Sequence, residues 1–143
     1  MPTKAILYPM LALVALTAIV AVTMYRRRIG EMRVRRIHPE KLALSAGIAS
    51  SLADTRAADN FRNLFEAPVL FYAAVLTIYA AQLTNPLHVG LAWAFVATRV
   101  AHSAIHCTYN RVMHRFAAFA VGLLLLFAIF GVIAFDLLVA DRG

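Results

Sequence analysis

Long apolar runs separated by short polar stretches dominate the sequence. The first run, residues 5–25, carries no charge, and its 21 residues would extend about 31 Å as a helix, enough to span a bilayer. The last run, residues 116–135, is also uncharged, whereas the two middle runs contain a few polar side chains. This pattern predicts four long helices, over residues 5–36, 56–83, 87–108 and 112–138.

Local signals mark the ends of these helices. His38-Pro39 should stop the first helix, because the residue before a proline avoids the α region. Asp54 or Thr55 can cap the second helix, and Thr84-Asn85-Pro86 forms a tight turn after it. Residues 41–51 are interpreted as either a short helix or an ordered loop, and a second turn is expected near residues 109–111.

Composition places this helical pattern in a membrane. Hydrophobic residues make up 62% of the 143 residues, against about 45–50% in a typical soluble domain. The expected fold is therefore all-α: an integral membrane four-helix bundle with a single domain over residues 1–143. Gly122 and Gly131 in the last helix are expected to allow close helix packing. The single cysteine, Cys107, excludes an internal disulfide.

The placement of charge predicts an orientation. The net charge is +7, and the basic residues flank the apolar runs, which argues against a nucleic-acid partner. The stretch between the first two helices and the turn between the last two carry eleven Lys and Arg residues, against Lys4 and Arg142 on the other side. The positive-inside rule predicts a multi-pass protein of the inner (plasma) membrane, with basic loops in the cytoplasm and both termini outside.

Two groups of polar residues interrupt the apolar helices. Arg62, Asn63 and Glu66 lie at the mouth of the second span, three and four residues apart. Arg99, His102 and His106 form a stripe on the third helix. Arg99 needs an anion, which is either Glu66, in an interhelical salt bridge, or a bound anionic ligand. Since the two histidines have no HExxH motif and no acidic or cysteine ligand beside them, no metal site is expected.

The order and spacing of these motifs resemble a known family. The chain is similar to bacterial-type members of the MAPEG family, the membrane-associated proteins of eicosanoid and glutathione metabolism. The resemblance covers roughly residues 28–119. It rests on four spans, a basic first loop, Arg62-Asn63-x-x-Glu66, Arg99-Val100-Ala101-His102, and the later Arg111 and Arg115.

The resemblance implies a homotrimer of four-helix bundles that binds glutathione between subunits near the cytoplasmic side and acts on a lipophilic small molecule. It implies that Glu66 takes the amino group of glutathione and that Arg115 is the catalytic arginine, which stabilises the thiolate. The other glutathione contacts that it implies are Arg33, Arg62, Asn63, Arg99, His102, His106 and Arg111.

The chain also departs from the family pattern. His106 stands where the prostaglandin E synthase branch has a tyrosine, Phe116 replaces a hydroxyl residue, and Asp59 replaces an arginine. The first hypothesis is therefore a glutathione-dependent transferase or peroxidase, with glutathione as co-substrate. The alternatives are a non-catalytic MAPEG-like membrane protein and, third, a small anion carrier.

Overall fold

The described part of the chain is mostly helical. The computed structural model describes residues 2–38, 40, 47 and 51–140, and the side chain of residue 140 is not included. These residues form a short 3-10 helix, η1 (Thr3–Ile6), and the α-helices α1 (Leu7–Arg35), α3 (Arg56–Asn63), α4 (Ala67–Ala80), α5 (Pro86–Cys107) and α6 (Val112–Ala140). The predicted all-α bundle is confirmed. The helix or loop expected over residues 41–51 lies almost entirely outside the described residues.

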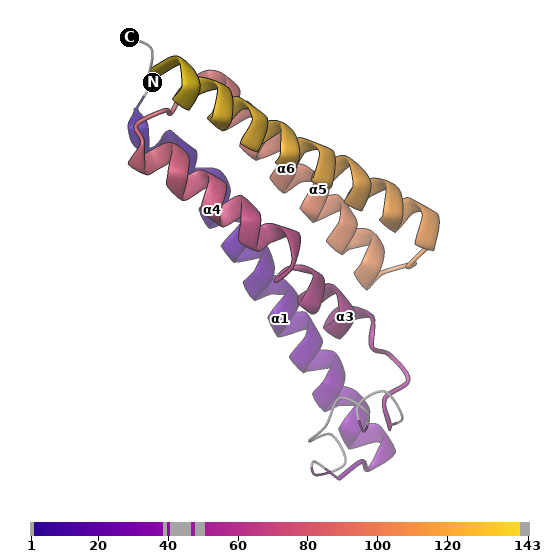
Figure 1. Ribbon diagram of the computed structural model, residues 1–143. Helices are drawn as coiled ribbons and strands as arrows, with labels where there is room; N and C mark the ends of the chain where they lie inside the picture. Colours follow the sequence, from indigo (N-terminus) through magenta and orange to yellow (C-terminus); the bar gives the residue numbers. More distant parts are fainter. Residues whose placement is uncertain (1, 39, 41–46, 48–50, 141–143) are drawn as a thin grey trace.

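The helices form a bundle whose two chain ends lie together. Figure 1 shows α5 and α6 side by side and α1 beside α4, with both termini at one end of the bundle. The described helical segments that are long and apolar enough to cross a membrane are Thr3–Arg35, Arg56–Ala80 and Val112–Val139. Turns of five and four residues join α5 to α4 and α6, and α5 packs along α6. The protein is therefore an integral membrane protein.

The second predicted helix is broken, which differs from the expected continuous helix over residues 56–83. Backbone turns at Leu64, Phe65 and Glu66 separate α3 from α4. Pro68 stands in the first turn of α4 and has no N–H to donate to the Leu64 carbonyl, so a continuous helix would lose that bond. The break places Glu66 at the beginning of α4, at the mouth of the apolar segment.

The other helix ends follow the signals in the sequence. The chain leaves α1 at Arg36, whose φ of 52° is left-handed. The N-cap of α3 is Thr55, and Asp54 Oδ1, one residue earlier, accepts the backbone N–H of Arg56 at 3.1 Å. Asn85 caps α5 by accepting the backbone N–H of His88 at 3.0 Å. These caps satisfy backbone groups that a helix end leaves without partners.

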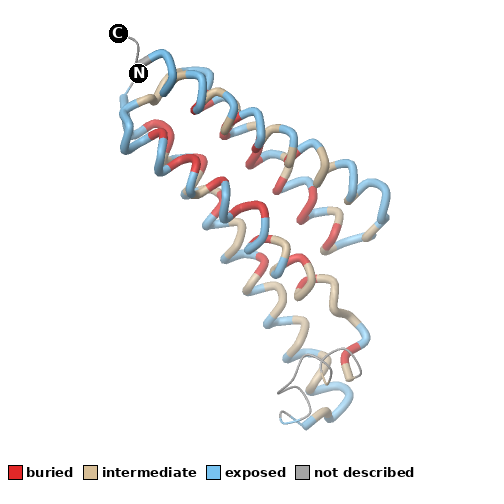
Figure 2. Tube along the Cα trace, in the orientation of Figure 1, coloured by how far each residue is buried: buried red, intermediate tan, exposed pale blue. Residues whose placement is uncertain are grey.

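The interior is apolar towards the termini and polar towards the 108–111 turn. Phe71 and Phe95 stack at a centroid distance of 4.6 Å in the apolar part, where Leu13, Ile78 and Ile129 are also fully buried. Figure 2 shows buried positions along the inner faces of the helices and exposed positions along their outer faces. Apart from His88, the buried polar side chains among the described residues lie on α3 and the second half of α5: Asn60, Arg99, His102, Ser103 and His106.

Candidate functional site

A pocket lies where the α3–α4 break faces the second half of α5 and the start of α6. Its volume is about 260 Å³. Four of the polar residues predicted for the site line it, together with three apolar side chains of α6. These lining residues are Asn63, Glu66, His102 and Arg115, with Val112, Phe116 and Phe119. The pocket therefore has an acidic, a basic and an apolar wall.

Arg115 is held at the rim of the pocket by two neighbours. Its Nη1 donates to His106 Nε2 and to Asn110 Oδ1, both at 2.9 Å. A guanidinium only donates hydrogen bonds, so Nε2 of His106 must be the acceptor and its proton must lie on Nδ1. The predicted site residues His106 and Arg115 are therefore in direct contact, and the neutral imidazole orients the guanidinium.

His102 is the polar group on the inner wall of the pocket. Its Nδ1 lies 3.1 Å from the backbone carbonyl of Arg115, which can only accept, so Nδ1 carries the proton and Nε2 is an acceptor. That Nε2 is buried and has no partner within the described part of the chain, and the same holds for His106 Nδ1. Because an unsatisfied buried polar atom is costly, a ligand that donates to His102 would be stabilised here.

Arg99 lies behind the pocket wall and is almost completely buried, with 1% of its surface exposed. Its guanidinium lies 5.2 Å from the ring centroids of Phe95 and Phe119, and Nη2 donates to the Phe119 carbonyl at 3.1 Å. Gly122 makes room for it, because a Cβ there would lie 2.2 Å from Nη2. The close packing expected at Gly122 therefore occurs, whereas Gly131 faces open space.

The expected salt bridge between Glu66 and Arg99 is not formed. Among the residues that the structure describes, Glu66 has no ion pair, and Arg99 is held by backbone carbonyls and aromatic faces instead. The reason is position: Glu66 is exposed at the helix break, whereas Arg99 is enclosed between α5 and α6. The carboxylate of Glu66 thus remains available to a ligand.

The remaining predicted arginines do not converge on the pocket within one chain. Arg33, Arg62 and Arg111 are exposed, and none of them lines the pocket. Arg62 approaches Asp59 at 3.9 Å, while Arg33 and Arg111 have no ion pair within the described residues. Within the described residues, a single chain therefore supplies one arginine, Arg115, to the pocket surface.

Three polar residues of this region were not identified from the sequence. Asn60 is fully buried, accepts from Ser103 Oγ at 3.3 Å and donates to Cys107 Sγ at 3.5 Å. Ser103 is the second of the three residues. The third is Asn110, whose side chain accepts a hydrogen bond from Arg115 and whose backbone has a left-handed φ of 49°. The sequence did contain a signal for Asn60, because it stands three residues before Asn63 and therefore lies on the same helical face.

Comparison with known proteins identifies the family. The model of the MAPEG family matches residues 6–135, nearly the whole chain. The chain belongs to the MAPEG family. The matched range of this MAPEG protein includes every residue that lines the pocket. No match to a curated protein or to a solved structure was found.

Proposed function

We propose that this MAPEG protein is a glutathione-dependent transferase or peroxidase that acts on a lipophilic electrophile. One observation carries the proposal: a carboxylate, a guanidinium and an aromatic wall share a single pocket, contributed by Glu66, Arg115 and Phe119. Family membership supports the same proposal, because the family is associated with glutathione.

The chemistry of the pocket residues suits a zwitterionic thiol. Glu66 would accept the ammonium group of glutathione, and Asn63 and His102 would bind its amide and thiol groups. Arg115 and the N-terminal end of α6 both favour a thiolate over a thiol. The thiolate sulfur would then form a bond to the electrophilic atom as the leaving group departs, so the nucleophile belongs to the ligand.

The apolar wall supports entry of the second substrate from the bilayer. Val112 and Phe116 are each 62% exposed and border the pocket, on the α6 segment that continues into the apolar span. An uncharged, lipophilic electrophile would partition into the bilayer and reach the thiolate past these side chains. A charged electrophile would not follow this route.

A homotrimer would complete the site. The pocket of about 260 Å³ is smaller than the roughly 300–1,000 Å³ of typical ligand sites, and glutathione has two carboxylates that need cations. Arg33, Arg62 and Arg111 are exposed, so we infer that a neighbouring subunit presents one or more of them to this pocket.

A second candidate is a MAPEG bundle that lacks the chemistry. Asp59 favours it, because this carboxylate replaces an arginine of the family pattern, accepts from Thr55 Oγ1 at 2.9 Å and lies 3.9 Å from Arg62. It would repel one carboxylate of glutathione and engage an arginine that would otherwise bind it.

A glutathione titration of the purified protein separates the two candidates. The detergent-solubilised protein is expected to gain thermal stability, by about 2.7 kcal/mol at a ligand concentration of 100 Kd, and to show the ultraviolet absorbance of the bound thiolate. Arg115→Gln should lose most of the thiolate signal. The matched control is Arg26→Gln, since Arg26 is exposed and lies outside the pocket.

The result that supports the second candidate is equally definite. An intact trimer, measured by mass in detergent, with no thermal shift and no thiolate absorbance at saturating glutathione would refute the enzymatic proposal.

A further inference from the structure

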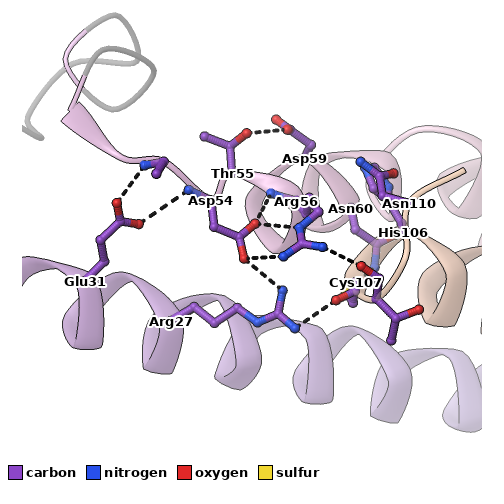
Figure 3. A network of polar contacts seen from close by, with 12 residues as sticks. Arg27, Glu31, Asp54, Thr55, Arg56, Asp59, Asn60, His106, Cys107 and Asn110 are labelled. Atoms are coloured by element: carbon purple, nitrogen blue, oxygen red, sulfur yellow. Dashed lines mark hydrogen bonds and ion pairs between the residues drawn. The ribbon is translucent and has the colours of Figure 1, made fainter. Parts of the chain in front are cut away.

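A network of ion pairs lies outside the pocket, at the C-terminal end of α5. Figure 3 shows Asp54 between two arginines, one from α1 and one from α3. Asp54 Oδ2 accepts from Arg27 Nη1 at 3.3 Å and from Arg56 Nη2 at 3.0 Å, while Oδ1 accepts from Arg56 Nε at 2.9 Å. One carboxylate therefore fixes the direction of both guanidinium groups.

Both arginines use their remaining N–H groups on the end of α5. Arg27 Nη2 donates to the carbonyl of Cys107 at 2.8 Å, and Arg56 Nη1 donates to the carbonyl of Thr108. The last carbonyls of a helix have no partners within the helix and carry a partial negative charge. The two guanidinium groups therefore hold the end of α5 against α1 and α3.

The same end of α5 carries the two residues that hold Arg115. His106 lies one residue before Cys107, and Asn110 lies two residues after Thr108. Asn110 is itself fixed by its backbone N–H, which donates to the Ile105 carbonyl at 2.8 Å. Displacement of the 107–108 backbone would thus move both contacts of the Arg115 guanidinium.

We infer that Asp54 is a positioning residue for Arg115: it aligns Arg27 and Arg56, they fix the end of α5, and that end orients the guanidinium in the pocket. The consequence for the thiolate rests on the proposed function, whereas the effect on the backbone of the turn does not.

The position of Asp54 is in turn fixed by α1. Glu31 accepts the backbone N–H groups of Ala53 and Asp54, at 2.6 and 3.4 Å, and Figure 3 shows these contacts on the opposite side of the network from α5. Asp54 is therefore anchored at its backbone as well as at its carboxylate.

Hydrogen–deuterium exchange of the full-length protein in detergent tests the effect on the turn. Asp54→Asn should speed exchange of the Thr108 and Asn110 amides about tenfold, the expected effect of losing one charge-assisted hydrogen bond, and should leave the middle of α6 unchanged. Arg27→Lys, which keeps the charge but cannot bridge Asp54 and the Cys107 carbonyl, is the milder second variant. Arg26→Gln, one residue earlier on α1, is the matched control.

A double-mutant cycle tests the link to Arg115. The loss of thermal stability caused by Asp54→Asn should be clearly smaller in an Arg115→Gln background, because the turn has already lost its contacts to α6. Asp54→Glu should restore most of the wild-type exchange. Strictly additive effects, or exchange that rises equally in all helices, would overturn the inference, since Asp54 would then act only on overall stability.

The glutathione readout keeps this inference separate from the proposed function. If wild type binds glutathione as a thiolate, Asp54→Asn should reduce the thiolate absorbance at saturation. If wild type binds no glutathione, the proposed function fails, and the exchange and cycle measurements still decide whether Asp54 positions Arg115.

Discussion

The close approach of α6 to Arg99 makes Gly122→Ala the most direct test of the bundle interior. The added Cβ would lie 2.2 Å from Arg99 Nη2 and 2.7 Å from Thr98 Oγ1. Ordinary contact begins near 3.4 Å, so the guanidinium must retreat by about 1.2 Å, the difference between these distances. That movement would break its bond to the Phe119 carbonyl.

The expected cost follows from three contributions. Overpacking costs about 1–3 kcal/mol, and losing a charge-assisted hydrogen bond costs about 1.5–3 kcal/mol. The better helix propensity of alanine offsets about 1 kcal/mol. We expect a net loss of about 1.5–5 kcal/mol in the free energy of unfolding, or roughly 4–15 °C in the thermal midpoint measured by circular dichroism in detergent.

Two variants make this prediction refutable. Gly131→Ala is the matched control on the same helix, since a Cβ there meets nothing within 4 Å, and it should be neutral or slightly stabilising. In an Arg99→Met background most of the cost of Gly122→Ala should disappear, leaving only the contact with Thr98. If Gly122→Ala is no more destabilising than Gly131→Ala, Arg99 does not occupy the place described.

Two further predictions concern the polar half of the bundle. The Arg56 guanidinium, together with Arg27, holds the pKa of the Asp54 carboxyl below its ordinary value of 3.8. The stabilisation is present above that value and is lost as the pH falls through the lower folded-state pKa, so below about pH 4 the thermal midpoint of wild type should fall more steeply than that of Asp54→Asn. Equal pH profiles of the two proteins would contradict this prediction. Asn60→Ala should lower the free energy of unfolding by about 1–3 kcal/mol. It should also speed alkylation of Cys107 by a maleimide, because the side chain that donates to Sγ is removed. Unchanged alkylation would show that Asn60 does not shield the thiol.

The helices could be predicted from the sequence because they depend on local spacing, and local spacing also brings some of the predicted polar residues together. Apolar runs and capping residues set the helix ends to within a few residues. Asn63 and Glu66 are only three residues apart, and both line the pocket although the turns at residues 64–66 interrupt the helix between them. His102 and Arg115 reach the same pocket because a short turn makes α5 and α6 antiparallel neighbours.

Features that depend on contacts across the bundle were not predicted. The sequence shows that Arg99 is charged, but it does not show that two aromatic rings and a glycine surround the guanidinium. The pairing of Asn60 with Ser103 joins residues 43 positions apart. The exposure of Arg33 follows from where α1 ends relative to the other helices. Side-chain direction and long-range pairing arise from packing, which no local pattern contains.

The break between α3 and α4 has a consequence for how the protein can diversify. It separates the apolar helix α4, which packs into the interior that contains the stacked Phe71 and Phe95, from the short polar helix α3, which contacts α1 and α5. Substitutions at the exposed positions of that short helix, such as Arg62, would therefore change the polar half of the bundle and leave the packing of the apolar interior intact.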